Sequence, residues 1–92
     1  MSKRKPVLSE TVEISKFWKN RRHDAIVTVL TPYEGRNLFD VRLHRMNREG
    51  CLVPTPKGIS VVVLRLPELA DAVNKALAKA KELGLLDDEA AE

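Results

Sequence analysis

The stretch PTPKGISVVVLRLPEL, residues 54–69, holds the change from strand to helix. Pro54 and Pro56 have no backbone N–H to donate, so this part of a strand is expected only at a sheet edge or a kink. Gly58 allows the backbone to bend or a ligand to approach closely, and Lys57 beside it can point into the groove so formed. The prolines and the glycine therefore predict the curved wall of a binding groove.

A helix follows this strand. The period of the apolar residues changes after residue 64, and Pro67 suits a first helical turn while Gly84 can close the last turn in a left-handed conformation. These signals predict a helix over residues 67–83. Its apolar residues recur at a spacing of three or four, which is one face of an α-helix; they are Leu66, Leu69, Val73, Leu77 and Ala80.

Three further strands precede the opening stretch. Sequential strands joined by short polar loops form an antiparallel meander. The sequence therefore predicts an α+β fold, a four-stranded antiparallel sheet followed by one C-terminal α-helix. The expected strands cover residues 11–19, 25–31, 38–46 and 51–64, with a polar break at 20–24 and hairpin loops at 32–37 and 47–50.

The third strand alternates cleanly, so its side chains divide between two faces. One helix can cover only one face of a sheet, which leaves the polar face for solvent or a ligand. Phe39, Val41 and Leu43 share the apolar face, and Asp40, Arg42 and His44 share the polar face.

Length and composition predict one small domain without disulfides. The 92 residues contain one cysteine, Cys51, and no stretch that is apolar over the ~18 residues needed to span a bilayer. We expect a cytoplasmic protein with no membrane contact. The expected organisation is a flexible basic arm over 1–10, a domain over 11–84 and an acidic tail over 85–92.

The charge is distributed unevenly. The net charge is +3, but residues 1–65 hold 13 lysines and arginines against 6 acidic residues, and residues 66–92 hold 3 against 7. A basic module of this kind attracts polyanions, nucleic acid first among them. An exposed basic sheet is a platform on which a single strand can lie extended.

Residues 35–60 resemble the single-stranded DNA-binding domain of the transcriptional positive cofactor four family. The most specific part runs from Met46 to Ser60, and the resemblance covers roughly residues 25–80. The matching residues are Gly35-Arg36, Asp40-Val41-Arg42, Met46-Asn47-Arg48-Glu49-Gly50, Pro54, Lys57-Gly58-Ile59-Ser60 and Pro67-Glu68.

This resemblance implies a homodimer with a strongly curved sheet in each subunit. It implies two grooves that bind unpaired DNA strands with little sequence preference, in a protein that assists transcription or protects and processes exposed single strands. The chain resembles the short bacterial members that consist of this domain alone, which would place it in the cytoplasm, associated with the nucleoid.

The resemblance also implies roles for single residues. Arg42 matches a family arginine on the uncovered face, and Tyr33 matches a phenylalanine that stacks on bases. Arg45 stands where the best-known member has a stacking tryptophan; strand parity places it on the core face unless a bulge turns it outward. Glu34 and Pro56 replace basic residues of the family pattern.

Other candidates for nucleic-acid binding come from basic residues beside a glycine or an aromatic residue. Arg36 and Lys57 follow Arg42 as expected phosphate contacts. The segment KFWKNRR, residues 16–22, interleaves aromatic and basic residues, which adds Lys16, Trp18 and Lys19. Alternation places Phe17 and Trp18 on opposite faces, one in the core and one available, without indicating which.

Enzymatic chemistry has no support in the sequence. His23 and His44 lack further ligands at metal spacing, and Cys51 has no base beside it, so no metal, cofactor or nucleophile is expected. Two alternatives to single-stranded DNA binding remain open. One is single-stranded RNA binding, and the other is a dimeric interaction module whose acidic helix and tail recruit transcription machinery.

Overall fold

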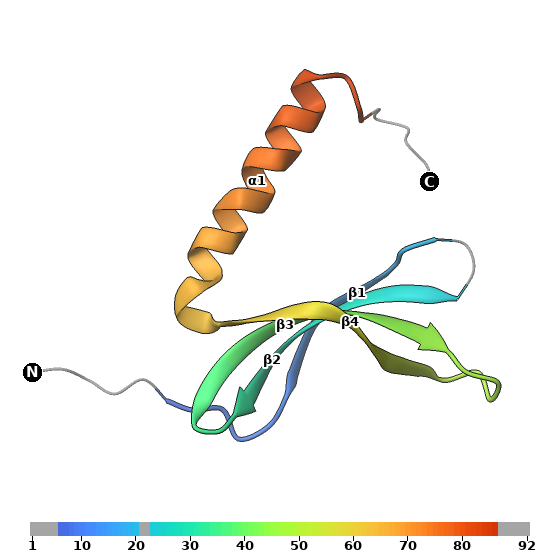
Figure 1. Cartoon of the computed structure of the whole chain (residues 1–92), viewed down its shortest axis with the longest axis vertical. Helices are drawn as coiled ribbons and strands as arrows, with labels where there is room; N and C mark the ends of the chain where they lie inside the picture. The colour runs from blue at the N-terminus through green and yellow to red at the C-terminus, as the bar shows by residue number, and fades with distance from the viewer. Residues whose placement is uncertain (1–5, 21–22, 87–92) are drawn as a thin grey trace, which may run out of the picture.

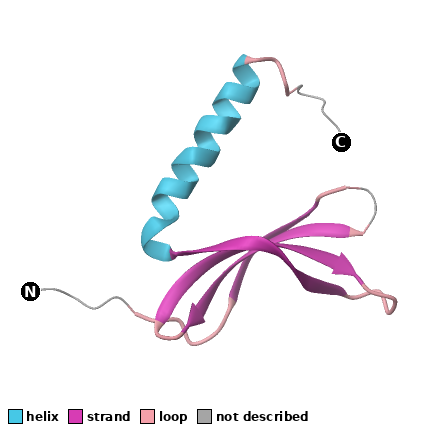
Figure 2. Cartoon of the chain, viewed as in Figure 1, coloured by secondary structure: helices cyan, strands magenta, loops and turns pink. Residues whose placement is uncertain are grey.

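The structure is a computed structural model that describes residues 6–20 and 23–86. A four-stranded antiparallel sheet is followed by one C-terminal helix, which confirms the predicted α+β architecture (Figures 1 and 2). The sheet order is β1-β2-β3-β4, so each strand pairs with its neighbour in sequence. The elements are β1 Val12–Trp18, β2 Asp24–Tyr33, β3 Arg36–Met46, β4 Leu52–Val62, the 3₁₀ turn η1 Val63–Arg65 and α1 Leu66–Glu82.

The prediction of a loop over residues 32–37 is wrong, because β2 and β3 continue almost to the tip of their hairpin. Tyr33 pairs with Arg36, so only Glu34 and Gly35 form the turn. Both have positive φ, 48° and 79°, which is the backbone that a tight two-residue hairpin turn requires. Tyr33 is therefore a strand-end residue and not part of a long loop.

Two irregularities bend the sheet. The pairing of β1 with β2 shifts between Glu13 and Ser15, and that of β3 with β4 shifts between Arg42 and His44. At the second shift Gly58 lies opposite Arg42 and Pro54 lies opposite His44, so residues 55–57 lie opposite Leu43 alone. A bulge of this kind bends its strand and increases the local twist. It also accommodates prolines, which cannot donate to a regular ladder.

The helix does not cover the sheet, contrary to the expectation that it covers one face. No residue of α1 is buried, and α1 extends from the end of β4 away from the strands (Figure 1). The reason is local: η1 follows β4 directly and runs into α1, so no connecting loop lets the helix turn back over the sheet. Among the described residues, the buried apolar side chains are those of Ala25, Val27 and Leu43.

Part of the segment expected as a flexible arm is attached to the sheet. The Asn37 side chain accepts a hydrogen bond from the Leu8 N–H at 2.9 Å and donates one to the Pro6 carbonyl at 2.8 Å. The remainder of that arm, the two arginines at 21–22 and the acidic tail from 87 lie outside the described residues. Within the described part, no helix is long and apolar enough to span a membrane.

Candidate nucleic-acid interface

Strand register sorts the candidate residues onto two faces, because residues directly opposite each other in antiparallel strands share a face. On one face Phe17, Ile26 and Leu43 lie in one row across β1, β2 and β3. We call this the cavity face. On the other face Lys16, Val27, Arg42 and Gly58 lie in one row, and Trp18, Ala25, His44 and Pro54 lie in the next. We call this the network face.

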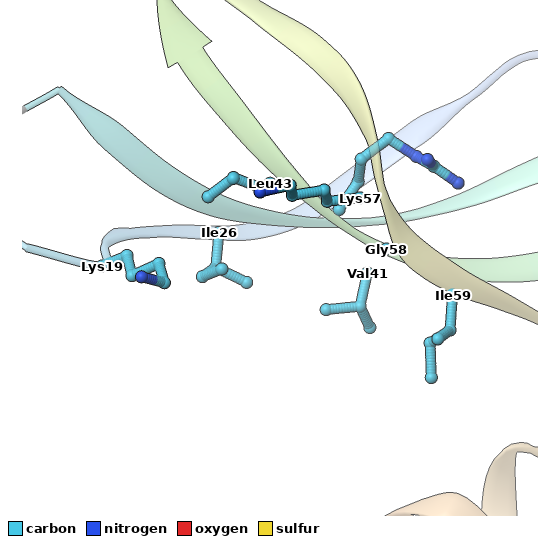
Figure 3. Close-up of a pocket in the computed structure, with 8 residues that line it drawn as sticks. Lys19, Ile26, Val41, Leu43, Lys57, Gly58 and Ile59 are labelled. Atoms are coloured by element: carbon cyan, nitrogen blue, oxygen red, sulfur yellow. The ribbon is translucent and has the colours of Figure 1, made fainter.

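The cavity face contains a cavity of about 310 Å³. Figure 3 shows Ile26, Val41 and Ile59 pointing to the same side of the sheet, where with Leu43 they form an apolar floor. Two lysines also line the cavity, Lys19 after β1 and Lys57 in the β4 bulge, and Arg42 and Gly58 complete the lining. The cavity therefore combines an apolar surface with two exposed cationic side chains from opposite edges of the sheet.

Phe17 adds an aromatic ring that the candidate residues from the sequence did not include. It lies opposite Ile26 of the cavity floor, and 56% of it is exposed. Trp18 is 57% exposed and lies opposite Ala25 on the network face. The expectation that one of the two is a core residue is wrong, because β1 is an edge strand with no described residue buried along it. Alternation showed that the two rings point apart, but the register was needed to show which one shares the face of the cavity.

Arg45 is exposed although it keeps the parity predicted from the sequence, because α1 does not cover the face on which it lies. It lies opposite Asp24, and its guanidinium forms an ion pair with that carboxylate at 3.0 Å. This hydrogen bond holds the pKa of Asp24 below its ordinary value. Arg45 shares the parity of Leu43, so it extends from the cavity face near the β3–β4 hairpin.

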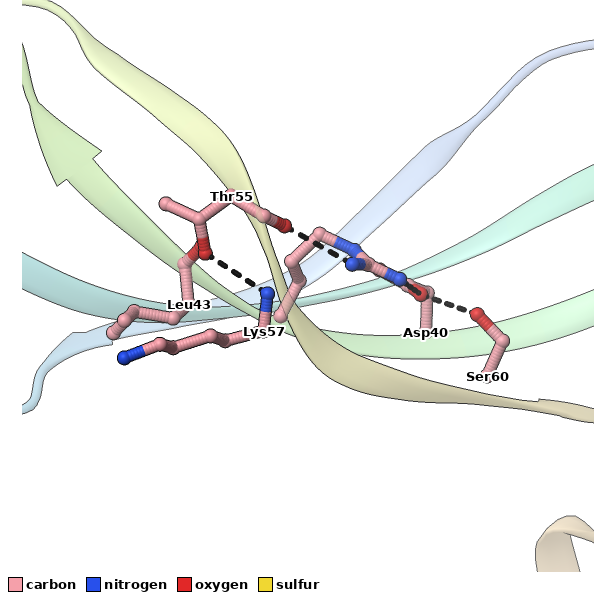
Figure 4. Close-up of polar contacts among 6 residues, drawn as sticks. Asp40, Leu43, Thr55, Lys57 and Ser60 are labelled. Carbon is pink, nitrogen blue, oxygen red and sulfur yellow. Dashed lines mark hydrogen bonds and ion pairs between the residues drawn. The ribbon is translucent and has the colours of Figure 1, made fainter.

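Arg42 does not extend freely from the network face. Its Nε and Nη2 groups donate to the two carboxylate oxygens of Asp40, at 3.0 and 2.7 Å, and its Nη1 donates to the Thr55 carbonyl at 3.0 Å. Ser60, which lies opposite Asp40, donates to the same carboxylate (Figure 4). The Arg42 hydrogen bonds hold the pKa of Asp40 below its ordinary value.

Tyr33 and Arg36 lie apart from the cavity, at the β2–β3 hairpin end. They pair with each other, share the parity of the network face and are both exposed, Tyr33 by 58%. The structure thus brings together Lys19, Lys57 and Arg45 on one face and Lys16, Trp18 and Arg42 on the other. No group of three or more His, Cys, Asp or Glu residues in the described part of the chain could hold a metal ion.

This fold and the sequence along it match a protein of known structure. A PC4 homolog from Burkholderia pseudomallei, in its tetragonal crystal form, has a TM-score of 0.65 and 30% sequence identity, over 73% of this chain and 97% of that chain. The chain belongs to the PC4 family. The orthorhombic form of the same PC4 homolog gives a TM-score of 0.66 and 28% identity, over 77% of this chain and 95% of that chain.

Membership in the PC4 family, the family of transcriptional positive cofactor four, confirms the resemblance found in residues 35–60. The likeness extends over almost all of the PC4 homolog and about three quarters of this chain. No family model matches the sequence, and no curated protein matches it.

Proposed function

We propose that this PC4-family chain is a non-enzymatic protein that binds single-stranded DNA without sequence preference, acts as a homodimer and functions in transcription. The observation that carries the proposal is the cavity on the sheet, where Lys19 and Lys57 flank an apolar floor. A single strand presents unpaired bases and phosphates together, and this surface offers complementary groups to both.

The chemistry of each part of the cavity suits one part of a nucleotide. Lys19 and Lys57 are exposed ammonium groups that can neutralise phosphates. Phe17 lies in the same row as the cavity floor and has its ring exposed, so a base can stack on it. Such stacking is worth about 1–3 kcal/mol per base and does not depend on base identity. Duplex DNA hides its bases, so it would lose this contribution.

The other residues predicted from the sequence remain predicted contacts along a longer strand. β1 forms the edge of the sheet, and its side chains alternate between the two faces. A DNA strand that passes around this edge would first contact Phe17 and Lys19 on one face and then Lys16 and Trp18 on the other. Arg45 beside the cavity, and Tyr33 and Arg36 at the β2–β3 end, would extend the contact in either direction.

A homodimer is supported by the apolar surface that the single chain leaves uncovered. Val73 and Leu77 of the α1 stripe are 58% and 44% exposed. Burying such side chains stabilises by about 1.5–3 kcal/mol each. A second copy, which carries the same apolar stripe, can cover the α1 side chains that the single chain leaves exposed.

The experiment is a fluorescence titration of labelled oligo-dT, duplex DNA and single-stranded RNA at several salt concentrations. We expect oligo-dT to bind more tightly than duplex, with a log–log salt slope of roughly −3.5 if about five phosphates are neutralised. Equal affinity for duplex and single strand, or an affinity independent of salt, would contradict the proposal. Tighter binding of RNA than of DNA of the same sequence would move the assignment to RNA.

Two lysine variants localise the site. Lys57→Ala should weaken binding and reduce the slope by about 0.7, the contribution of one phosphate contact. Lys75→Ala is the matched control, because Lys75 lies on α1 with its side chain 78% exposed and ion-paired to Asp71. The control should bind as the unmodified protein does. Equal effects of the two variants would show that only overall charge matters.

A further inference from the structure

The guanidinium of Arg42 is hydrogen-bonded to other groups of the same chain. It donates two hydrogen bonds to Asp40 and one to the Thr55 carbonyl, and 26% of the side chain is exposed. Arginine and carboxylate form their strongest pairing in this two-bonded geometry. The partner carboxylate also offsets the positive charge that a phosphate would otherwise meet.

Arg42 holds the bulge from which Lys57 extends. Residues 55–57 lie opposite Leu43 alone, and Pro56 within them has no N–H, so regular ladder bonds cannot fix this segment. Side chains replace them. Arg42 binds the Thr55 carbonyl, the Thr55 hydroxyl donates to the Leu43 carbonyl at 2.8 Å, and the Lys57 N–H donates to the Thr55 hydroxyl at 3.2 Å (Figure 4).

The network continues on the far side of the guanidinium. Ser60 donates to Asp40, and Asp40 in turn holds Arg42, so β3 and β4 are joined on both sides of Gly58. The chain of contacts therefore runs from the network face, through the bulge, to a lysine that lines the cavity on the opposite face. Hydrogen bonds thus connect the two faces of the sheet at the bulge.

We infer that Arg42 is a positioning residue that sets the bulge and so presents Lys57 to the cavity, instead of contacting phosphate itself. This inference rests on the proposed function, because it assigns Lys57 the contact with the nucleic acid. It differs from the role predicted for Arg42 from the sequence. A direct phosphate contact by Arg42 and an effect through Lys57 give different results when both residues are changed.

The test is a double-mutant cycle with oligo-dT, read as affinity and as salt slope. Arg42→Ala and Lys57→Ala should each weaken binding, and each should reduce the slope by about 0.7, since both remove the Lys57 contact. In the Lys57→Ala background, Arg42→Ala should change the affinity less than about twofold and leave the slope unchanged. An additive loss of affinity with a further reduction of about 0.7 in the slope would overturn the inference.

Two more variants separate position from charge. Thr55→Val keeps the carbonyl but removes the hydroxyl that holds Lys57, and it changes no charge. Thr55→Val should therefore lower the affinity for oligo-dT, as Arg42→Ala does. Arg42→Lys keeps the charge but has no fork that reaches Asp40 and Thr55 together, so it should resemble Arg42→Ala. Unchanged affinity in both variants would indicate a role for charge alone and would overturn the inference.

The controls keep this result distinct from the proposed function. Circular dichroism and urea unfolding establish that each variant folds, and Thr55→Val carries the test if Arg42→Ala does not fold. If the unmodified protein fails to prefer single strands, the proposed function fails. If it binds as expected but Lys57→Ala has no effect, or the cycle is additive, only the positioning role of Arg42 fails.

Discussion

At the scale of single residues, charge alone is a poor guide to which side chains can meet a ligand. Arg42 and Lys57 are both cationic and both line the cavity, yet the Arg42 guanidinium is paired with Asp40, whereas Lys57 is an exposed residue of the β4 bulge. The sequence contained part of this distinction, because alternation already placed Asp40 and Arg42 on one face two residues apart. It did not contain the third contact, since the Thr55 carbonyl comes within reach of Arg42 only through the β4 bulge.

The ion pair between Asp40 and Arg42 predicts a loss of stability in acid. The pKa of Asp40 is lowered from its ordinary value of 3.8 by the Arg42 hydrogen bonds. A carboxyl whose pKa is depressed in the folded state contributes stability above its unfolded pKa, and this contribution is lost as the pH falls through the folded pKa. At pH values below about 4, the urea concentration at the unfolding midpoint should therefore decrease. The decrease should be larger than the one that the change in net charge alone causes.

Asp40→Asn tests the origin of this loss. The variant should have a lower urea midpoint than the unmodified protein at pH 7, and the gap between the two should narrow on acidification to pH 3. The pKa of Asp24 is lowered in the same way by Arg45, so some acid sensitivity should remain in the variant. A gap that stays constant from pH 7 to pH 3 would show that the Asp40 charge contributes nothing to folding.

At the scale of elements, the sequence predicted what depends on local periodicity. Alternation of side chains predicted the third strand, and spacing of three or four predicted α1 to within one residue at each end. The sequence-based prediction failed where the structure depends on how two strands pair with each other. Pro32 and Asn37 look like loop residues in isolation, but they pair with each other across β2 and β3.

The candidate site was predicted only in part, for the same reason. Lys57 beside Gly58 indicated a groove, and the structure places Lys57 in the lining of a cavity. The division of the remaining candidates between two faces depends on the register of four strands and on the bulge in β4. Phe17 was not chosen from the sequence because Trp18 beside it is also an aromatic residue in the same basic segment. Only the pairing of Phe17 with Ile26 places Phe17 on the cavity face.

The contact between β3 and β4 predicts that Gly58 cannot be replaced. A Cβ atom at this position would lie 2.4 Å from the Val41 carbonyl oxygen and 2.9 Å from the Arg42 Cα, both backbone atoms that a side-chain rotation cannot move. Gly58→Ala should therefore lower the free energy of unfolding by about 1–3 kcal/mol, the usual cost of overpacking. Urea denaturation of the purified variant measures this value.

Gly50→Asn is the matched control for this substitution. Gly50 has a φ of 83°, and a Cβ atom added there would meet no heavy atom within 4 Å beyond its chain neighbours. Asparagine tolerates the left-handed region better than most residues. Gly50→Asn should therefore cost less than Gly58→Ala. An equal loss in the two variants would assign the effect to glycine backbone freedom and not to the close approach of the strands.

At the scale of the whole molecule, one chain leaves too much of its surface uncovered for a compact domain. Its accessible surface is 7759 Å², whereas a compact monomer of 10.4 kDa exposes roughly 5,400 Å². Its radius of gyration is 16.2 Å, against about 12 Å for a globular domain of this length. The projecting helix accounts for part of this excess, since α1 has no buried residue.

If a second copy covers this surface, folding and association are coupled, and the stability of the protein depends on its concentration. The thermal midpoint should rise as the protein is concentrated from about 1 to 100 μM, and sedimentation should show dimers over the same range.

Leu77→Asp places a charge in the apolar stripe of both copies. It removes at least about 3 kcal/mol of apolar burial from a symmetric dimer, so it should weaken association more than a hundredfold. Lys75→Ala, on the opposite side of α1, should leave association unchanged. A thermal midpoint that is independent of concentration, with Leu77→Asp as stable as the unmodified protein, would mean that the chain folds as a monomer and that α1 is free to bind a different partner.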